Sequence, residues 1–195
     1  MQSNTHKAII AIIIAVMLFY VFSCVAQVIH IHKPYYNSHY NLGTKCPSKV
    51  TWTLRAHDLG SVKRKPSWTF APDIPDSLAV VRSSDYIRSG YHRGHLCPAA
   101  DRSASEEAML STFAMSNIAP QAPALNTGNW LASERWCRQA ALLYDSVQVL
   151  VVPIFLDRDT IYIGRHALGV PHAFFKAVWL PKNDSIINHW FIWNK

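Results

Sequence analysis

The sequence contains no internal repeat and no low-complexity segment, and its four cysteines are widely spaced. Repeat folds show self-similarity at a fixed period, so this class is excluded. No Cys-x-x-Cys pair occurs, and no Cys/His spacing is typical of a structural zinc site. The 195 residues, half of them hydrophobic, are enough for one domain of ordinary size with its own core.

Charge is absent from one long segment, residues 8–29, which is nearly all apolar. A run of about 20 apolar residues can span a bilayer, and this one is long for the apolar part of a secretory signal. We therefore expect residues 1–29 to be a signal or anchor segment and the protein to be exported to the cell envelope. A membrane anchor, lipidation at Cys24, and cleavage that releases a periplasmic or secreted protein all stay open.

Export would place the remaining cysteines in an oxidising compartment, where one disulfide could form and one thiol would be left. The sequence does not choose the pair among Cys46, Cys97 and Cys137. The formal net charge is +7, and a basic surface suits a polyanionic partner such as nucleic acid or an anionic membrane.

Patterning along the chain predicts the domain and its elements. Residues 30–43, rich in Tyr, His and Asn, indicate a linker, which leaves residues 44–195 for the folded domain. Strict alternation over Lys49–Arg55 predicts a half-buried strand. The stretch Ser61–Asp76 contains three prolines and a basic run, which favours a loop.

Two central helices are expected. Ser103 and Glu106 have capping-box spacing in front of a helix over residues 104–115, and a second helix is predicted from about Asn129 to Tyr144. Further strands are predicted over residues 147–156, 160–164, 173–180 and 186–193. Strands before and after two helices predict an α+β domain built on a mainly antiparallel central sheet.

Two clusters of reactive side chains follow one another. The first, YHRGHLCPAADR at 91–102, contains His92, Arg93, His95, Asp101 and Arg102. Alternation puts Arg93 and His95 on one side, and Gly94 would let a ligand approach the backbone. Taken alone, this cluster also fits a polar turn with a structural histidine.

The second cluster lies in residues 116–138. Asn117 and Asn126 fall in its irregular part, and Glu134 and Arg138 are spaced i, i+4 on the predicted helix. Alone, this cluster also fits a helix ion pair with asparagines in turns. Together the clusters supply what phosphodiester hydrolysis requires: a neutral imidazole base, oxygen ligands for a hard cation, and arginines for the transition-state charge.

The two motifs resemble those of the DNA/RNA non-specific endonucleases, the Serratia-type and endonuclease G-like ββα-metal (His-Me finger) nucleases. The likeness extends from about Tyr40 to Asn194 and rests on the joint spacing of Arg93-Gly94-His95, Ser116-Asn117-Ile118, Pro120-Gln121, Asn126, Gly128, Trp130, Glu134 and Arg138. It implies an α+β, ββα-metal fold and an endonuclease that cuts DNA and RNA with little sequence specificity.

The resemblance also implies a role for each matching residue. His95 is similar to the general base that activates water, and Asn126 to the direct ligand of a single Mg²⁺, for which Mn²⁺ or another divalent cation can substitute. Glu134 matches the acidic residue that holds water of the metal shell, and Asn117 the asparagine that orders the site. Arg93 and Arg138 match arginines near the scissile phosphate, and Arg64 is similar to an upstream phosphate-contacting arginine.

One position departs from the family pattern. His92 stands where the best-known members have Asp, and it cannot supply the carboxylate that balances the arginines there. We expect it to contact substrate and to shift the pH profile. Two alternatives to the nuclease stay open, a non-catalytic nucleic-acid-binding protein on the same fold and a narrower phosphodiesterase acting on nucleotides. The oligomeric state is not predicted.

Overall fold

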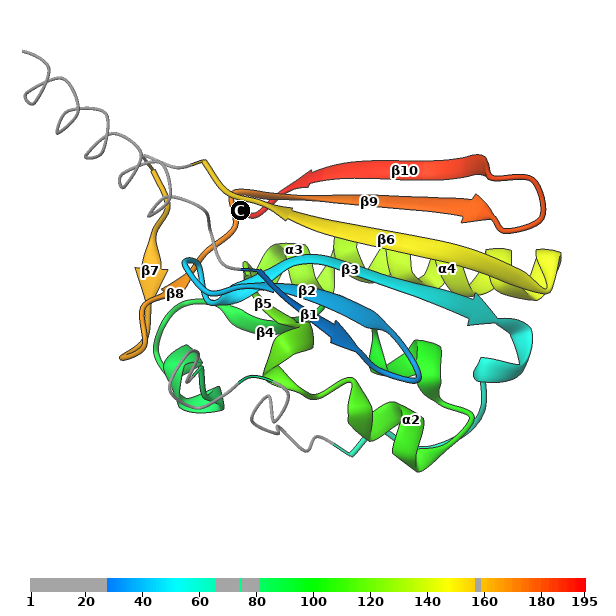
Figure 1. Ribbon diagram of the computed structural model, residues 1–195, viewed down its shortest axis with the longest axis horizontal. Coiled ribbons are helices and arrows are strands. Elements are labelled where there is room, and N and C mark those ends of the chain that lie inside the picture. The colour runs from blue at the N-terminus through cyan, green and yellow to red at the C-terminus, as the bar shows by residue number, and fades with distance from the viewer. Residues whose placement is uncertain (1–27, 66–73, 75–80, 157–158) are drawn as a thin grey trace, which may run out of the picture.

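A six-stranded antiparallel sheet forms the centre of the computed structural model, which describes residues 28–65, 74, 81–156 and 159–195 (Figure 1). The strand order is β1 (Val28–His32), β2 (Asn37–Asn41), β3 (Cys46–Arg55), β6 (Ser146–Ile154), β9 (Ala173–Leu180) and β10 (Ser185–Trp193). Two small antiparallel pairs accompany it, β4 (His92–His95) with β5 (Ile118–Gln121), and β7 (Tyr162–Ile163) with β8 (Leu168–Gly169). The predicted α+β class with a mainly antiparallel sheet is confirmed.

Period-two alternation builds the inner face of this sheet. Val50, Trp52 and Leu54 of β3 are buried, and the residues between them are half-buried. Val149 pairs directly with Trp52, and Val147 with Leu54. Since successive side chains of a strand point to opposite faces, this inner layer is the surface on which the long helix packs.

The long helix α4 (Asn129–Tyr144) lies across the inner face, as Figure 1 shows. Its bounds are those predicted from the sequence. The buried positions are Trp130, Ser133, Cys137, Ala140 and Ala141, whose spacing of three or four residues defines one stripe of the helix. The opposite stripe carries the exposed Leu142 and Leu143.

A short helix, α3 (Pro123–Thr127), precedes α4, and Gly128 joins them. Pro123 stands at the first helical position, where its missing N–H is not needed. A β-carbon on Gly128 would lie 2.6 Å from the carbonyl oxygen of Ala124, so only glycine allows this tight junction. The junction fixes the relative placement of the two helices.

The N-terminal part of the domain differs from the prediction. Residues 30–43, predicted as a linker, are largely strands β1 and β2, and β1 begins inside the segment predicted as an anchor. Local alternation is hidden by polar side chains, but Ile31, Ser38 and Tyr40 are buried and β2 pairs with β3. Residues 1–27 lie outside the described part of the chain. None of the described helices is long and apolar enough to cross a membrane.

The first helix is also shorter than predicted and capped by a different residue. Helix α2 spans Glu106–Ser111, and the Ser105 hydroxyl accepts a hydrogen bond from the Ala108 amide at 3.2 Å. The predicted cap, Ser103, instead accepts from the Gly60 amide at 2.9 Å and donates to the Ala100 carbonyl at 3.0 Å. The Ser103 hydroxyl, which the local spacing predicted as the helix cap, is therefore used in a tertiary hydrogen bond instead.

Asn194, just after β10, joins three separate segments. Its Oδ1 accepts from the Ala122 amide at 2.7 Å, and its Nδ2 donates to the carbonyls of Pro120 at 3.0 Å and Pro171 at 2.7 Å. Pro120 belongs to β5, so this side chain fixes one edge of the β4–β5 strand pair. The three described cysteines, Cys46, Cys97 and Cys137, are buried free thiols.

Candidate functional site

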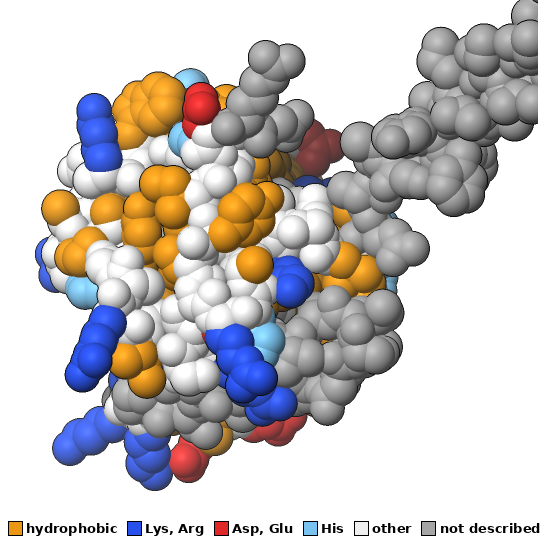
Figure 2. Space-filling model, turned by 90° about the vertical axis from the view of Figure 1, so that its left-hand side faces the viewer, with side chains coloured by type: hydrophobic (Ala, Val, Ile, Leu, Met, Phe, Trp, Pro, Cys, Tyr) orange, Lys and Arg blue, Asp and Glu red, His pale blue; other side chains and the backbone are white. Residues whose placement is uncertain are grey.

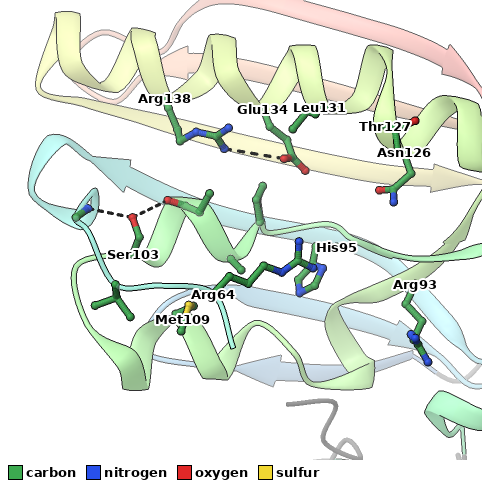
Figure 3. Close-up of a pocket in the computed structure, with 15 residues that line it drawn as sticks. Arg64, Arg93, His95, Ser103, Met109, Asn126, Thr127, Leu131, Glu134 and Arg138 are labelled. Atoms are coloured by element: carbon green, nitrogen blue, oxygen red, sulfur yellow. Dashed lines mark hydrogen bonds and ion pairs between the residues drawn. The ribbon is translucent and has the colours of Figure 1, made fainter. Parts of the chain in front are cut away.

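A cleft of about 480 Å³ lies between helix α4 and the loop through Arg64. Figure 3 shows side chains from separate elements converging on it. Six of the predicted site residues line this cleft: Arg64, Arg93, His95, Asn126, Glu134 and Arg138. Of the other predicted residues, His92 lines a neighbouring hollow and Asn117 is fully buried behind the site.

The first strand of the antiparallel β4–β5 pair carries Arg93 and His95. Gly94 pairs with Ala119, and His95 with Ile118. The Trp130 indole of α4 donates to the His95 carbonyl at 3.2 Å, which joins this strand pair to the helix. The predicted approach of a ligand to Gly94 is wrong, because Gly94 is buried and the Gln121 side chain occupies the space of its missing β-carbon.

His95 is largely buried, with 8% of its surface exposed. Its ring meets the Phe113 ring edge-on, with 4.7 Å between centroids. Burial lowers the pKa of the His95 imidazole to about 3, and the nearby Arg64 guanidinium adds to the shift. The imidazole is therefore neutral at physiological pH, which is the form a general base needs. A phosphate beside Arg64 would oppose the arginine's effect and make the base stronger.

Asn117 holds the segment behind His95 with all its amide groups. Its Nδ2 donates to the carbonyls of Cys97 and Thr112, each at 2.9 Å, and its Oδ1 accepts from the Cys97 amide at 2.9 Å. Its own carbonyl accepts from the Leu96 amide at 2.9 Å. Asn117 therefore orders the chain beyond β4 and does not face the cleft.

Asn126 lies on α3, where the sequence indicated irregular structure. Its Nδ2 is 3.1 Å from His92 Nδ1. If the amide donates to the ring nitrogen, the Asn126 Oδ1 is left as the oxygen directed to other partners. In that case the hydrogen bond to His92 orients the Asn126 amide.

Glu134 and Arg138 of α4 form the predicted i, i+4 pair, with 3.9 Å between Arg138 Nη1 and Glu134 Oε2. The closer partner of Arg138 Nη1 is Asp101 Oδ1, at 2.9 Å. Trp52 Nε1 donates to the other Asp101 oxygen at 3.1 Å. The fully buried Asp101 thus holds Arg138 at the cleft wall, which leaves Glu134 less tightly paired.

Sequence reasoning gave no role to Asp101 or Lys176. Lys176 is 1% exposed, donates to Ser133 Oγ at 2.8 Å and lies 3.6 Å from the centre of the Trp130 ring. Burial lowers its pKa, and burial raises that of Asp101 against the effect of Arg138. The available signal for Lys176 was its place between Phe174 and Val178 on the inward side of an alternating strand.

Arg93 and Arg64 complete the basic side of the cleft. Arg93 Nη1 donates to Ser83 Oγ at 2.7 Å and to the Ser83 carbonyl at 3.3 Å, which fixes the guanidinium. The Arg64 guanidinium lies 5.5 Å from the centre of the Phe113 ring. Two arginines at one side and Arg138 at the other form a site suited to a phosphate group.

Burial raises the pKa of the Glu134 carboxyl from its ordinary value of 4.5 to about 7, although Lys176 opposes the shift. Between pH 4.5 and about pH 7, Glu134 keeps its proton in the folded protein and has lost it in the unfolded chain. The stability of the folded protein therefore falls as pH rises through this range. We expect Glu134→Gln to melt at a higher temperature than the parent, with a gap that widens from about pH 5 to about pH 8. Thermal melts in EDTA would measure this gap.

The control for this prediction is Glu106→Gln, which removes a carboxylate with 55% of its side chain exposed. Its charge is not penalised by burial, and its ion pair with the exposed Lys65 is worth little, so no comparable gap is expected. A gap for Glu134→Gln that stays constant with pH would contradict the raised pKa.

The cleft offers few groups to a metal ion. Within the described residues, no group of three or more His, Cys, Asp or Glu side chains is placed to hold one. Asn126 Oδ1 and the Glu134 carboxylate are the oxygen donors that line the cleft opposite His95 (Figure 3). This set fits Mg²⁺, which prefers oxygen and keeps most of its waters, and does not fit a cation that needs several protein ligands.

Two paired antiparallel strands, the first of which carries the histidine, are followed by helices that carry the asparagine and the glutamate, and this arrangement defines the ββα-metal nuclease fold. The family described as DNA/RNA non-specific endonuclease matches residues 19–194. The chain belongs to this family, as the sequence motifs predicted.

Several curated relatives of this chain are named as mitochondrial nucleases. It is 34% identical to Nuclease EXOG of Danio rerio over 65% of this chain and 40% of that protein. It is 31% identical to Nuclease 1 of Schizosaccharomyces pombe over 80% of this chain and 48% of that protein. It is 38% identical to Endonuclease G of Bos taurus over 66% of this chain and 46% of that protein. The matches thus span less than half the length of these relatives.

A solved structure shows the same fold. The chain superimposes on a chain of the EndoG/EndoGI complex, a crystal structure that describes how EndoG is inhibited, with a TM-score of 0.78 and 24% sequence identity. The superposition covers 85% of this chain and 74% of the other.

The predicted localisation is wrong by these comparisons. Export to the cell envelope was inferred from the apolar segment, but the curated relatives named above are mitochondrial proteins. The segment itself, up to residue 27, lies outside the described residues.

Proposed function

We propose that this protein is an endonuclease that hydrolyses phosphodiester bonds of DNA and RNA with little sequence specificity. The observation that supports this most directly is the single cleft that collects a buried imidazole, three arginines, an asparagine and a glutamate. Family membership supports the same reaction class. Arginines bind phosphate without reading bases, so contacts of this kind carry no sequence information directly.

Each side chain has a distinct task in this proposal. Arg93 and Arg64 bind the scissile phosphate, and Arg138 adds charge where the transition state becomes more negative. The neutral His95 imidazole takes a proton from the attacking water. The ring is positioned edge-on against Phe113, and Asn117 holds the backbone that follows it in place.

Asn126 would hold Mg²⁺, or Mn²⁺ in its place, through Oδ1, and Glu134 would hold water of the metal shell. The bound cation supplies positive charge to a phosphoryl oxygen and to the leaving oxygen. The His92–Asn126 hydrogen bond turns the amide oxygen toward this task. Glu134 is suited to its role because Arg138 is occupied mainly by Asp101.

The direct test of the function uses plasmid DNA and single-stranded RNA, each with Mg²⁺ and with EDTA. We expect both to be degraded with Mg²⁺ and neither with EDTA. If neither is degraded with Mg²⁺ present, the non-catalytic binding protein becomes the better account. If only mononucleotide esters are hydrolysed, the narrower phosphodiesterase is correct.

The metal assignment has its own readout. We expect Asn126→Ala to weaken Mn²⁺ binding, measured by electron paramagnetic resonance without substrate, by roughly 10- to 100-fold or more. Asn129→Ala is a matched control, because this asparagine lies at the start of α4 and does not line the cleft. Unchanged Mn²⁺ affinity in Asn126→Ala would show that the metal lies elsewhere.

We also propose that the apolar stretch before β1 can hold the protein at a membrane. Residues 8–27 carry no charge and are nearly all apolar, and about 20 such residues suffice to span a bilayer. Partition of the full chain and of a chain that starts at Val28 between detergent and water would test this association.

A further inference from the structure

A second hollow of about 300 Å³ borders the cleft and is lined by Tyr86, Ile87, Tyr91, His92, Arg93 and Asn126. Arg93 and Asn126 also line the cleft, so the two spaces are adjacent. Its volume is at the lower end of the range, roughly 300–1,000 Å³, of small-molecule sites. A group bound here would sit next to a phosphate held by Arg93.

The walls of this hollow combine apolar and aromatic surface with basic groups. Ile87 has 68% of its surface exposed, so an apolar side chain borders the hollow. Tyr91 and the His92 ring supply flat faces, and Arg93 supplies charge at the border. Figure 2, which faces the end of the molecule that carries β7 and β8, shows apolar side chains gathered among Lys and Arg side chains.

The turn that presents Ile87 and Tyr91 is held by a dense set of hydrogen bonds. Ser89 Oγ donates to the Tyr86 carbonyl at 2.9 Å and accepts from the Tyr91 amide at 3.1 Å. Gly90 has φ 83°, a conformation that favours glycine. Such a turn holds its exposed side chains in place before any ligand arrives, which lowers the entropic cost of binding.

His92 is fixed as one wall because Nδ1 is hydrogen-bonded to Asn126 Nδ2. The resemblance places a carboxylate at this position in the best-known family members. A carboxylate would repel a polyanionic strand, whereas an imidazole face can stack on an aromatic ring. The departure at position 92 therefore makes this hollow more favourable to an aromatic ligand.

We propose that the hollow is a nucleobase subsite, which binds the base of a nucleotide adjacent to the scissile phosphate. The inference rests on the proposed function. Every base has a π-face, so stacking against Tyr91, His92 and Ile87 tolerates any sequence. A base must leave its duplex to enter, so the subsite favours single strands over duplexes.

The test compares two single-stranded substrates of equal length, oligothymidylate and an oligomer of abasic tetrahydrofuran nucleotides. Both have the same phosphates, so the cleft treats them alike. We expect the parent to cleave oligothymidylate with a kcat/KM roughly tenfold higher. Ile87→Ser and Tyr91→Ala should lose most of this preference. In both variants we expect kcat/KM for oligothymidylate to fall and kcat/KM for the abasic oligomer to stay unchanged.

Ile186→Ser is the matched control, since Ile186 is 67% exposed and lies on β10, away from both spaces. It should keep the parent's preference. Equal cleavage of both substrates by the parent, or equal loss on both in the two variants, would overturn the subsite. Absence of cleavage of either substrate by the parent would instead overturn the proposed function.

Discussion

His95→Ala should reduce hydrolysis of plasmid DNA and RNA by roughly 10²- to 10⁴-fold, the usual contribution of a general base. His95 is the one histidine that lines the cleft among the described residues. Its buried ring is neutral at physiological pH because burial lowers its pKa to about 3. Initial rates with Mg²⁺ in excess would measure the loss, and Mn²⁺ binding should be unchanged because the metal is assigned to Asn126.

A loss of activity could also come from a damaged fold, so two further variants keep the assignment testable. His95→Gln retains a polar side chain of similar size beside Phe113 and should be as inactive as the alanine variant. His189→Ala removes a histidine from the exposed side of β10 and should retain full activity. Free imidazole should restore part of the rate to His95→Ala, since the deletion leaves space for it in the cleft. Activity of His95→Ala equal to that of the parent would exclude the general-base role.

Asn117→Ala should destabilise the protein by at least about 3 kcal/mol, because three buried backbone groups lose a hydrogen bond and each costs about 1–3 kcal/mol. These groups are the Cys97 amide, the Cys97 carbonyl and the Thr112 carbonyl. The loss is large against a total stability of about 5–15 kcal/mol. Urea denaturation followed by tryptophan fluorescence would measure it.

Asn126→Ala is the matched comparison for this prediction. It deletes the same side chain from a half-buried position on α3, where the amide is hydrogen-bonded to the exposed His92. We expect its free energy of unfolding in EDTA to stay within about 1 kcal/mol of the parent. If the two variants were equally stable, Asn117 would not be the structural anchor of the segment behind His95.

Much of the fold could be predicted because its signals are local. The bounds of α4 and β9 match the prediction, since one apolar stripe and one alternating pattern define them. Strands β1 and β2 were missed because their polar side chains hide the alternation. Backbone pairing stabilises them, because β1 pairs with β2 and β2 pairs with β3, and residue type alone does not report such pairing.

The candidate site was predicted residue by residue from its motifs, but its internal connections were not. The pairing of Arg138 with Asp101 joins residues 37 positions apart, and spacing along α4 pointed to Glu134 instead. The burial of Lys176 beneath Trp130 likewise depends on how the sheet packs against the helix. Side-chain partners in the site are set by tertiary packing, which a single sequence does not encode in its periodicity.

Asn194 has a consequence for the order in which a ribosome delivers the chain. Strand β4, which carries Arg93 and His95, leaves the ribosome long before the Asn194 side chain that bonds to Pro120 and to the Ala122 amide. Strands β9 and β10, which pack beside α4, also emerge late. A nascent chain therefore carries all its reactive side chains before it can hold them in their final geometry. For a protein proposed to cut RNA, we therefore expect the site to reach its final geometry only after the last strand has been synthesised.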